Sequence, residues 1–180
     1  MRCVLLLRGV NVSGAKRVPM TELKRMLADL GLTDVRTLLN SGNAVFTVAA
    51  RTSLSRLTAT IETAIETTFG FTSRSFVLSA AELDVVIAEN PVVDRIDNPS
   101  RCLVAFLRAE EDGTRLAPLV RQNWGAEVFA VGSRACYLWC ADGIATSVLP
   151  DALGNAVKHD VTTRNWATVL KLQALCASGR

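Results

Sequence analysis

The spacing of hydrophobic residues changes several times within the first 80 positions, and each change predicts a new element. Residues 2–8 (RCVLLLR) contain the apolar run Cys3–Leu7, which is typical of a strand buried on both faces. From Met20 onward, apolar side chains recur every three or four residues until Gly31, which is the spacing of a helix ended by glycine. Two short strands, VRTLL and NAVFTV, then flank the turn at residues 40–43, and a helix in SLSRLTATIETAIETTFG precedes a strand in FTSRSFVLS.

The pattern restarts in the second part of the chain after a helix and a polar linker. The helix is expected in AAELDVVIAEN, where Pro91 stops it, and PVVDRIDNPS is the linker. A strand over residues 101–108 begins the second series. It is followed by a helix over 113–123, strands in EVFAV and ACYLWCA around the turn GSR, and helical stretches around 144–157 and 163–177.

The matching order of elements predicts an internal duplication. Residues 4–9 (VLLLRG) also resemble residues 104–109 (VAFLRA). We therefore predict an α+β fold of two ferredoxin-like (βαββαβ) halves with mainly antiparallel sheets, in which the second copy lacks a clear closing strand. The expected domains are a first half over 1–79, a connecting helix and linker over 80–100, and a second half with the C-terminal helices over 101–180.

This topology predicts which loops are neighbours. Strands one and two run parallel with strand three antiparallel between them, so the end of strand one lies beside the turn between strands two and three. The loop after residue 8 should therefore lie next to residues 40–43. The strands at 2–8 and 101–108 should be mostly buried on both faces because their apolar runs are continuous.

Composition and charge argue against several classes of protein but do not indicate a particular function. The net charge of +3 is too small to indicate nucleic acid or an anionic membrane, although residues 1–40 hold seven basic side chains against three acidic ones. No stretch is long enough for a membrane span or a signal peptide, so a cytoplasmic location is expected. Five unevenly spaced cysteines indicate reduced thiols, and Cys136 and Cys140 are expected in the core rather than on a metal.

The segment RGVNVSGAKRVP resembles a phosphate-binding Walker A loop but lacks its chemistry. Gly9 and Gly14 have the required separation. However, Ala15 displaces the lysine to position 16, and Arg17 stands where a magnesium-binding hydroxyl is needed. A looser anion site formed by glycine-permitted backbone N–H groups, Arg8, Lys16 and Arg17 is one hypothesis. The other is a glycine-shaped connector with surface cations.

Three motifs resemble one bacterial family. RGVNVSGAKRVPMTELKRMLADLG, VRTLLNSGNAVF and TTRNWATVLKL are similar, in this order, to members of the family catalogued as domain of unknown function 1697. The chain departs from the family pattern at Ser13 and Ala15, where members usually carry glycine and asparagine. The resemblance implies two ferredoxin-like halves, in agreement with the pattern of elements, and implies no activity.

The third motif is expected at the start of a helix. Thr162 or Thr163 could cap that helix, and Arg164 would share one face with Thr168 and Lys171. Hydroxyls and an arginine at a helix start are suited to an anion, whereas a capped helix with Trp166 as a core anchor is the structural alternative. His159 is the single histidine and is expected to be a surface residue.

We therefore predict a site for a small phosphate- or carboxylate-bearing ligand at loops between the two halves. The alternatives are nucleic-acid backbone binding through the same basic loops, and a protein-interaction module without catalysis. RNA binding on the sheet face is disfavoured because the central strand carries no aromatic residue. No cofactor or metal is implied, no catalytic residue can be nominated, and the sequence does not indicate an oligomeric state or whether the protein is an enzyme. The predicted ligand-binding residues are Arg8, Asn11, Lys16, Ser41, Asn43, Thr162, Thr163, Arg164 and Asn165.

Overall fold

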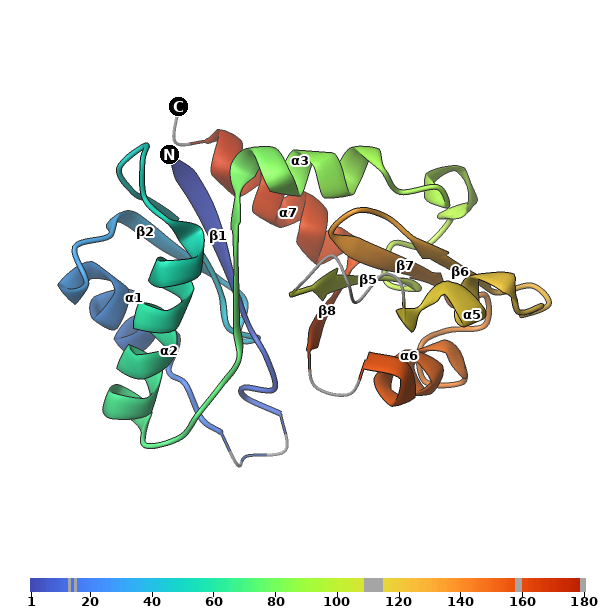
Figure 1. Cartoon of the computed structure of the whole chain (residues 1–180), viewed down its shortest axis with the longest axis horizontal. Helices are drawn as coiled ribbons and strands as arrows, with labels where there is room; N and C mark the ends of the chain where they lie inside the picture. Colours follow the sequence, from blue (N-terminus) through green and yellow to red (C-terminus); the bar gives the residue numbers. More distant parts are fainter. Residues whose placement is uncertain (13, 15, 109–114, 158–159, 179–180) are drawn as a thin grey trace. The chain divides into compact units, whose positions relative to one another are not determined.

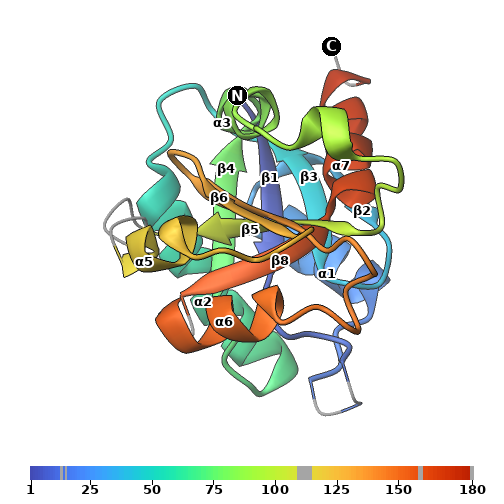
Figure 2. The ribbon, with the colours of Figure 1, turned by 90° about the vertical axis from the view of Figure 1, so that its right-hand side faces the viewer.

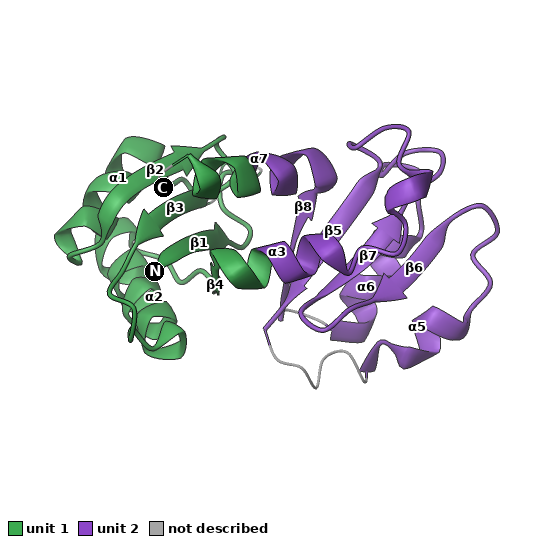
Figure 3. Ribbon diagram, turned by 90° about the horizontal axis from the view of Figure 1, so that it is seen from above, with its two compact units in different colours: residues 1–83, 172–180 green, residues 84–171 purple. Residues whose placement is uncertain are grey.

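A computed structural model describes residues 1–180 except 13, 15, 109–114, 158–159 and 179–180 (Figure 1). It has an α+β architecture with two four-stranded antiparallel sheets. The chain divides into two compact units (Figure 3). Unit 1 comprises Met1–Leu83 and Leu172–Arg180, and unit 2 comprises Asp84–Lys171. The domain boundaries at 79 and 100 stay a prediction.

Unit 1 follows the element order expected from the sequence. Its sheet has the order β2-β3-β1-β4, which can be followed from β4 to β2 in Figure 2. β1 is antiparallel to both of its neighbours, and β2 is antiparallel to β3, so β1 and β2 run parallel as predicted. The elements are β1 (Arg2–Leu7), α1 (Met20–Asp29), β2 (Thr33–Leu38), β3 (Asn43–Thr47), α2 (Leu54–Phe69) and β4 (Ser75–Ser79).

Helices α1 and α2 cover one face of this sheet (Figure 1). Their apolar stripes pack against alternate residues of β1, namely Cys3, Leu5 and Leu7. The intervening residues Val4 and Leu6 are also fully buried. β1 is therefore buried on both faces, as its continuous apolar run predicted.

Unit 2 contains a second four-stranded sheet, with the order β6-β7-β5-β8. All six residues of β5 are buried, which confirms the prediction for this strand. The core on one face includes α6 side chains packed against alternate residues of β5 and β7. The elements are α3 (Ala80–Ala88, beginning in unit 1), a short 3₁₀ helix (Val93–Arg95), β5 (Cys102–Leu107), α5 (Ala117–Arg121), β6 (Val128–Val131), β7 (Ala135–Trp139), α6 (Leu149–Val157), β8 (Val161–Asn165) and α7 (Trp166–Ala177, ending in unit 1).

The prediction that the second copy lacks a closing strand was wrong. β8 pairs antiparallel with β5 over five residues, from Val161 opposite Leu107 to Asn165 opposite Leu103. Its sequence VTTRN contains only one aliphatic residue, so it lacks the apolar alternation that predicts a strand. β8 is an edge strand, however, and an edge position tolerates polar side chains and suits β-branched threonines.

Candidate functional site

Three segments of unit 1 meet at the end of β1. The backbone N–H of Leu7 donates to the Gly42 carbonyl at 2.8 Å, and that of Arg8 donates to the Arg74 carbonyl at 3.0 Å. The Ser73 hydroxyl donates to the Arg8 carbonyl at 2.9 Å. The expected proximity of the opening loop to residues 40–43 is therefore confirmed. We call the described residues of 8–18, 40–43 and 72–74 the loop end.

Asn11 ties two of these segments together. Its Nδ2 donates to the carbonyls of Val18 (2.9 Å) and Asn40 (2.6 Å), and its Oδ1 accepts from the Val18 N–H at 2.8 Å. The backbone of Asn11 is left-handed, with φ of 57°, a conformation that asparagine tolerates better than most residues. The amide group of Asn11 is thus committed to closing the opening loop.

Lys16 ties the opening loop to the third segment. Its Nζ donates to the Thr72 carbonyl at 2.7 Å and lies 5.7 Å from the centre of the Phe71 ring. Helix α1 begins only at Met20, after an extended Pro19. The geometry therefore differs from a Walker A loop, in which the lysine lies on the first turn of the helix and reaches the phosphates.

The turn between β2 and β3 is held by a buried amide. Asn43 is fully buried, and its Nδ2 donates to the Leu38 carbonyl at 3.0 Å and to the Ser41 hydroxyl at 2.9 Å. Gly42 adopts a φ of 73° and lies against the side chains of Leu7 and Val10. Ser41 and Asn43 therefore stabilise the turn that forms one side of the loop end.

The three segments of the loop end carry charge of one sign, although the Glu62 carboxylate of α2 accepts from the backbone N–H of Ser75, next to the loop end, at 2.8 Å. Segments 8–18, 40–43 and 72–74 carry four basic residues and no acidic residue. Arg17 and Arg74 are exposed, whereas Arg8 and Lys16 are half-buried. Because the segments are joined by hydrogen bonds, these cations are gathered at one end of the sheet.

The second group of predicted site residues lies in unit 2, on β8. Arg164 is buried, with 8% of its surface exposed, and donates to the Thr162 hydroxyl (3.0 Å) and the Thr163 carbonyl (2.7 Å). Burial lowers the pKa of its guanidinium from 12.5 to about 10, because desolvation disfavours the charged form. Thr162 is buried, and Thr163 is exposed.

The start of α7 differs from the prediction. The Oδ1 of Asn165 accepts from the backbone N–H of Thr168 at 2.9 Å and from its hydroxyl at 2.7 Å. Asn165 therefore caps the helix, and the expectation that Thr162 or Thr163 would do so was wrong. The reason is that both threonines belong to β8. His159, Ser13 and Ala15 lie outside the described residues.

The five cysteines have no disulfide partner and are all buried. Cys136 and Cys140 belong to the core of unit 2, as expected. Among the described residues, no group of three or more His, Cys, Asp or Glu side chains could hold a metal ion. Burial raises the pKa of Cys3 from 9.0 to about 11 and that of Cys102 to about 12, and it also raises the pKa values of Cys140 and Tyr137.

These raised pKa values predict a loss of stability at high pH. The unfolded chain releases thiol protons above pH 9, whereas folded Cys3 and Cys102 keep theirs until about pH 11–12. The contribution of these two thiols to the free energy of unfolding is therefore complete below pH 9. It is lost progressively as the pH rises from there through the pKa values of the folded state. At pH 10 the two thiols together should cost about 2–3 kcal/mol of unfolding free energy, measured by urea denaturation. A Cys102→Ala variant should show a shallower decline, and an equal decline would contradict the assignment.

No helix among the described residues has the length and apolar character needed to cross a membrane.

Comparison with known proteins places the chain in a family. A family model described as "Protein of unknown function (DUF1697)" matches residues 1–137, which include the first two motifs but not TTRNW. The solved structure of the conserved bacterial protein SP0830 from Streptococcus pneumoniae is similar, with a TM-score of 0.79 and 25% sequence identity. The alignment covers 97% of this chain and 98% of that chain. No curated protein matches the chain. Since the family match extends over more than half of the sequence, the chain belongs to the DUF1697 family of proteins of unknown function.

Proposed function

We propose that unit 1 binds a small anionic ligand, carrying a phosphate or carboxylate group, at the loop end. The observation that carries this proposal is the charge of the three joined segments, which hold Arg8, Lys16, Arg17 and Arg74 without an acidic residue. Guanidinium groups favour phosphate and carboxylate because their N–H groups can make two parallel bonds to such anions.

The ties described above support this proposal by fixing the loops in advance. Asn11 and Asn43 donate from their amide groups to backbone carbonyls, and the Lys16 ammonium donates one of its three protons to the Thr72 carbonyl. We infer that these bonds hold the loop end in place before a ligand binds. A loop that is already ordered loses less conformational entropy when it binds.

We also propose that each unit is a ferredoxin-like half and that the two arose by internal duplication. The two sheets have the same topology: in the orders β2-β3-β1-β4 and β6-β7-β5-β8, corresponding strands occupy corresponding positions. The expectation from the sequence that Thr162–Asn165 of unit 2 also bind an anion stays a prediction, and it is tested below through Arg164.

Two alternatives use the same surface. A nucleic-acid backbone would be attracted by the same cations, and a protein partner could contact the same loops. RNA recognition on a sheet face is not favoured, because β1 and β5 are buried on both faces and cannot stack bases.

The test is a titration of the full chain with pyrophosphate at low salt, in which binding is measured by isothermal titration calorimetry. We expect saturable binding that weakens by about tenfold or more in Arg17→Gln and Arg74→Gln, because each loses a charge-assisted hydrogen bond. Arg51→Gln is the matched control, since Arg51 is exposed and belongs to the segment after β3, at the opposite end of the sheet.

Each outcome of this titration bears on the proposal. Equal losses in Arg17→Gln, Arg74→Gln and Arg51→Gln would show a diffuse charge effect rather than a site. An absence of saturable binding to the wild-type chain would also overturn the proposal. A parallel titration with a single-stranded oligonucleotide distinguishes the nucleic-acid alternative, which predicts a steep loss of affinity as the salt concentration rises.

A further inference from the structure

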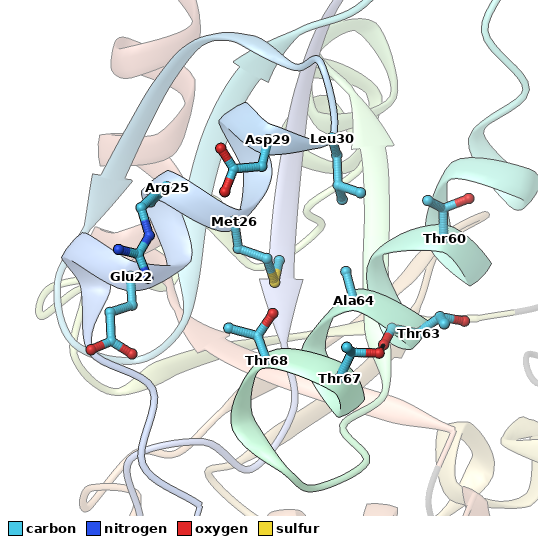
Figure 4. A pocket seen from close by; sticks show the side chains of 10 residues that line it. All are labelled: Glu22, Arg25, Met26, Asp29, Leu30, Thr60, Thr63, Ala64, Thr67 and Thr68. Atoms are coloured by element: carbon cyan, nitrogen blue, oxygen red, sulfur yellow. Dashed lines mark hydrogen bonds between the residues drawn. The ribbon is translucent and has the colours of Figure 1, made fainter.

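A groove separates α1 from α2 in unit 1, and its lining residues Glu22 and Thr68 each lie four residues in sequence from the loop end (Figure 4). Its volume is about 580 Å³, which is the size of a site for a small molecule. Helix α1 contributes charged residues and two apolar ones, whereas α2 contributes mainly threonines. The lining residues are Glu22, Arg25, Met26, Asp29 and Leu30 from α1, and Thr60, Thr63, Ala64, Thr67 and Thr68 from α2.

The α2 wall offers hydrogen-bond acceptors. The hydroxyls of Thr60, Thr63 and Thr67 donate to backbone carbonyls one turn earlier, at 3.0, 3.1 and 3.0 Å. A hydroxyl has one proton and two lone pairs, so these oxygens retain acceptor capacity but have no proton left to donate. An incoming ligand must therefore supply the donors to these three hydroxyls.

The threonines are not explained by the stability of the helix. Five of the sixteen residues of α2 are threonine, which is among the weaker helix formers. Four of these five line the groove. Their concentration on this wall, at some cost in helix propensity, is consistent with a role in binding.

The α1 wall carries more negative than positive charge. Glu22 and Asp29 provide two carboxylates, and Arg25 between them provides one guanidinium. These three side chains are exposed, and within the described part of the chain none of them forms an ion pair. Met26, Leu30 and Ala64 add an apolar surface between the polar groups.

We propose that this groove binds an aliphatic amine of the polyamine class. An ammonium group has three donors and no acceptor, which complements carboxylates together with hydroxyls that can only accept. The methylene groups of such a ligand would pack on Met26 and Ala64. An anion would instead meet two carboxylates and have Arg25 as its single charged partner in the lining. The site is separate from the loop end and carries the opposite charge preference.

The first experiment blocks the groove and leaves its charge unchanged. Spermidine is titrated into the full chain at low salt by isothermal calorimetry, and we expect saturable one-site binding. Ala64→Trp should weaken this binding by at least about tenfold, because a large ring fills the space between the helices. Ala59→Trp is the matched control, since Ala59 is exposed on the same helix and does not line the groove. Thermal melts confirm that both variants are folded.

The second experiment removes the charge and leaves the shape unchanged. The double variant Glu22→Gln, Asp29→Asn should weaken spermidine binding by about three- to tenfold, whereas Glu66→Gln, an exposed α2 residue outside the groove lining, should not. Hexane-1,6-diol, an uncharged chain, should not bind. Three results would each overturn the proposal. They are an equal loss of spermidine affinity in the Glu22→Gln, Asp29→Asn double variant and in Glu66→Gln, unchanged spermidine binding in Ala64→Trp, and no saturable binding to the wild type. Pyrophosphate binding should be unchanged in all groove variants, so this inference and the proposed function fail independently.

Discussion

Replacing Gly42 with alanine should lower the free energy of unfolding by about 2–5 kcal/mol. Gly42 has a φ of 73°, which costs an L-amino acid about 1–2 kcal/mol. A Cβ at this position would also lie 2.6 Å from Cγ2 of Val10 and 2.7 Å from Cβ of Leu7. The Leu7 atom is next to the backbone, so it cannot move aside without disturbing β1. The predicted loss is measured by urea denaturation of the purified chain.

Gly31→Ala is the matched control for this experiment. Gly31 has a φ of 80°, but a Cβ added there meets nothing within 4 Å. Its substitution therefore measures the backbone cost alone, which we expect to be about 1–2 kcal/mol. The difference between the two variants isolates the steric contact with Leu7 and Val10. If the two variants lose the same stability, the close packing of the β2–β3 turn against the end of β1 is wrong.

Arg164→Ala should lower the free energy of unfolding by about 1–3 kcal/mol, because it removes hydrogen bonds of a buried group. The bonds lost include those to the Thr162 hydroxyl and the Thr163 carbonyl. Arg164→Met keeps most of the side-chain volume and discards the charge. Since burial lowers the pKa of Arg164 to about 10, the fold disfavours the charged form, and methionine should recover much of the lost stability.

The methionine variant also tests the predicted ligand role of Arg164. If Arg164→Met is as stable as the wild type but no longer binds pyrophosphate, the guanidinium is retained for the ligand. If binding is unchanged, the prediction that Arg164 belongs to the site is wrong and its role is structural. If methionine is as destabilising as alanine, the hydrogen bonds of the guanidinium rather than its volume stabilise β8.

The elements with strong periodicity were predictable from the sequence. α1, α2 and the strands of unit 1 follow from apolar spacing and from Gly31 and Gly70, which end the helices with left-handed backbone. The expected helix over 144–157 is shorter, beginning at Leu149. The expected helix over 113–123 is described only from Ala117 to Arg121. β8 was missed because polar residues at an edge strand leave no apolar alternation to detect.

The proximity of the segments that form the loop end was predictable from the sequence, but the hydrogen-bond partners of their side chains were not. Topology alone put the opening loop beside the β2–β3 turn. In the structure, three of the polar residues that suggested a ligand site bond the backbone. Asn11 and Lys16 each donate to a carbonyl of another segment, and Asn43 donates to the Leu38 carbonyl within the β2–β3 turn. A sequence shows that a side chain can donate, but only the folded chain shows what accepts. Asparagine in a glycine-containing loop was the available signal, since it commonly closes turns in this way.

The groove between α1 and α2 had no counterpart in the sequence. Amphipathic spacing identifies the face of each helix that is buried, but not the separation between two helices on the same sheet. That separation depends on the side chains at the helix contact, and here it leaves a groove lined by Met26 and Ala64. The sequence shows the threonines of α2, but only the folded structure shows that most of them line a groove.

Unit 1 is discontinuous in the chain, and this affects how the protein can be made and dissected. Its second portion begins at Leu172, where buried Leu172 and Cys176 and a hydrogen bond from Arg36 to Ser178 bring α7 into the unit. During synthesis, residues 1–83 therefore leave the ribosome long before the segment that completes their packing. Unit 2 has the position of an inserted domain, and a gene fragment ending after α3 would encode unit 1 without one of its own helical segments. The packing of unit 1 can therefore be completed only after the segment that begins at Leu172 has been synthesised.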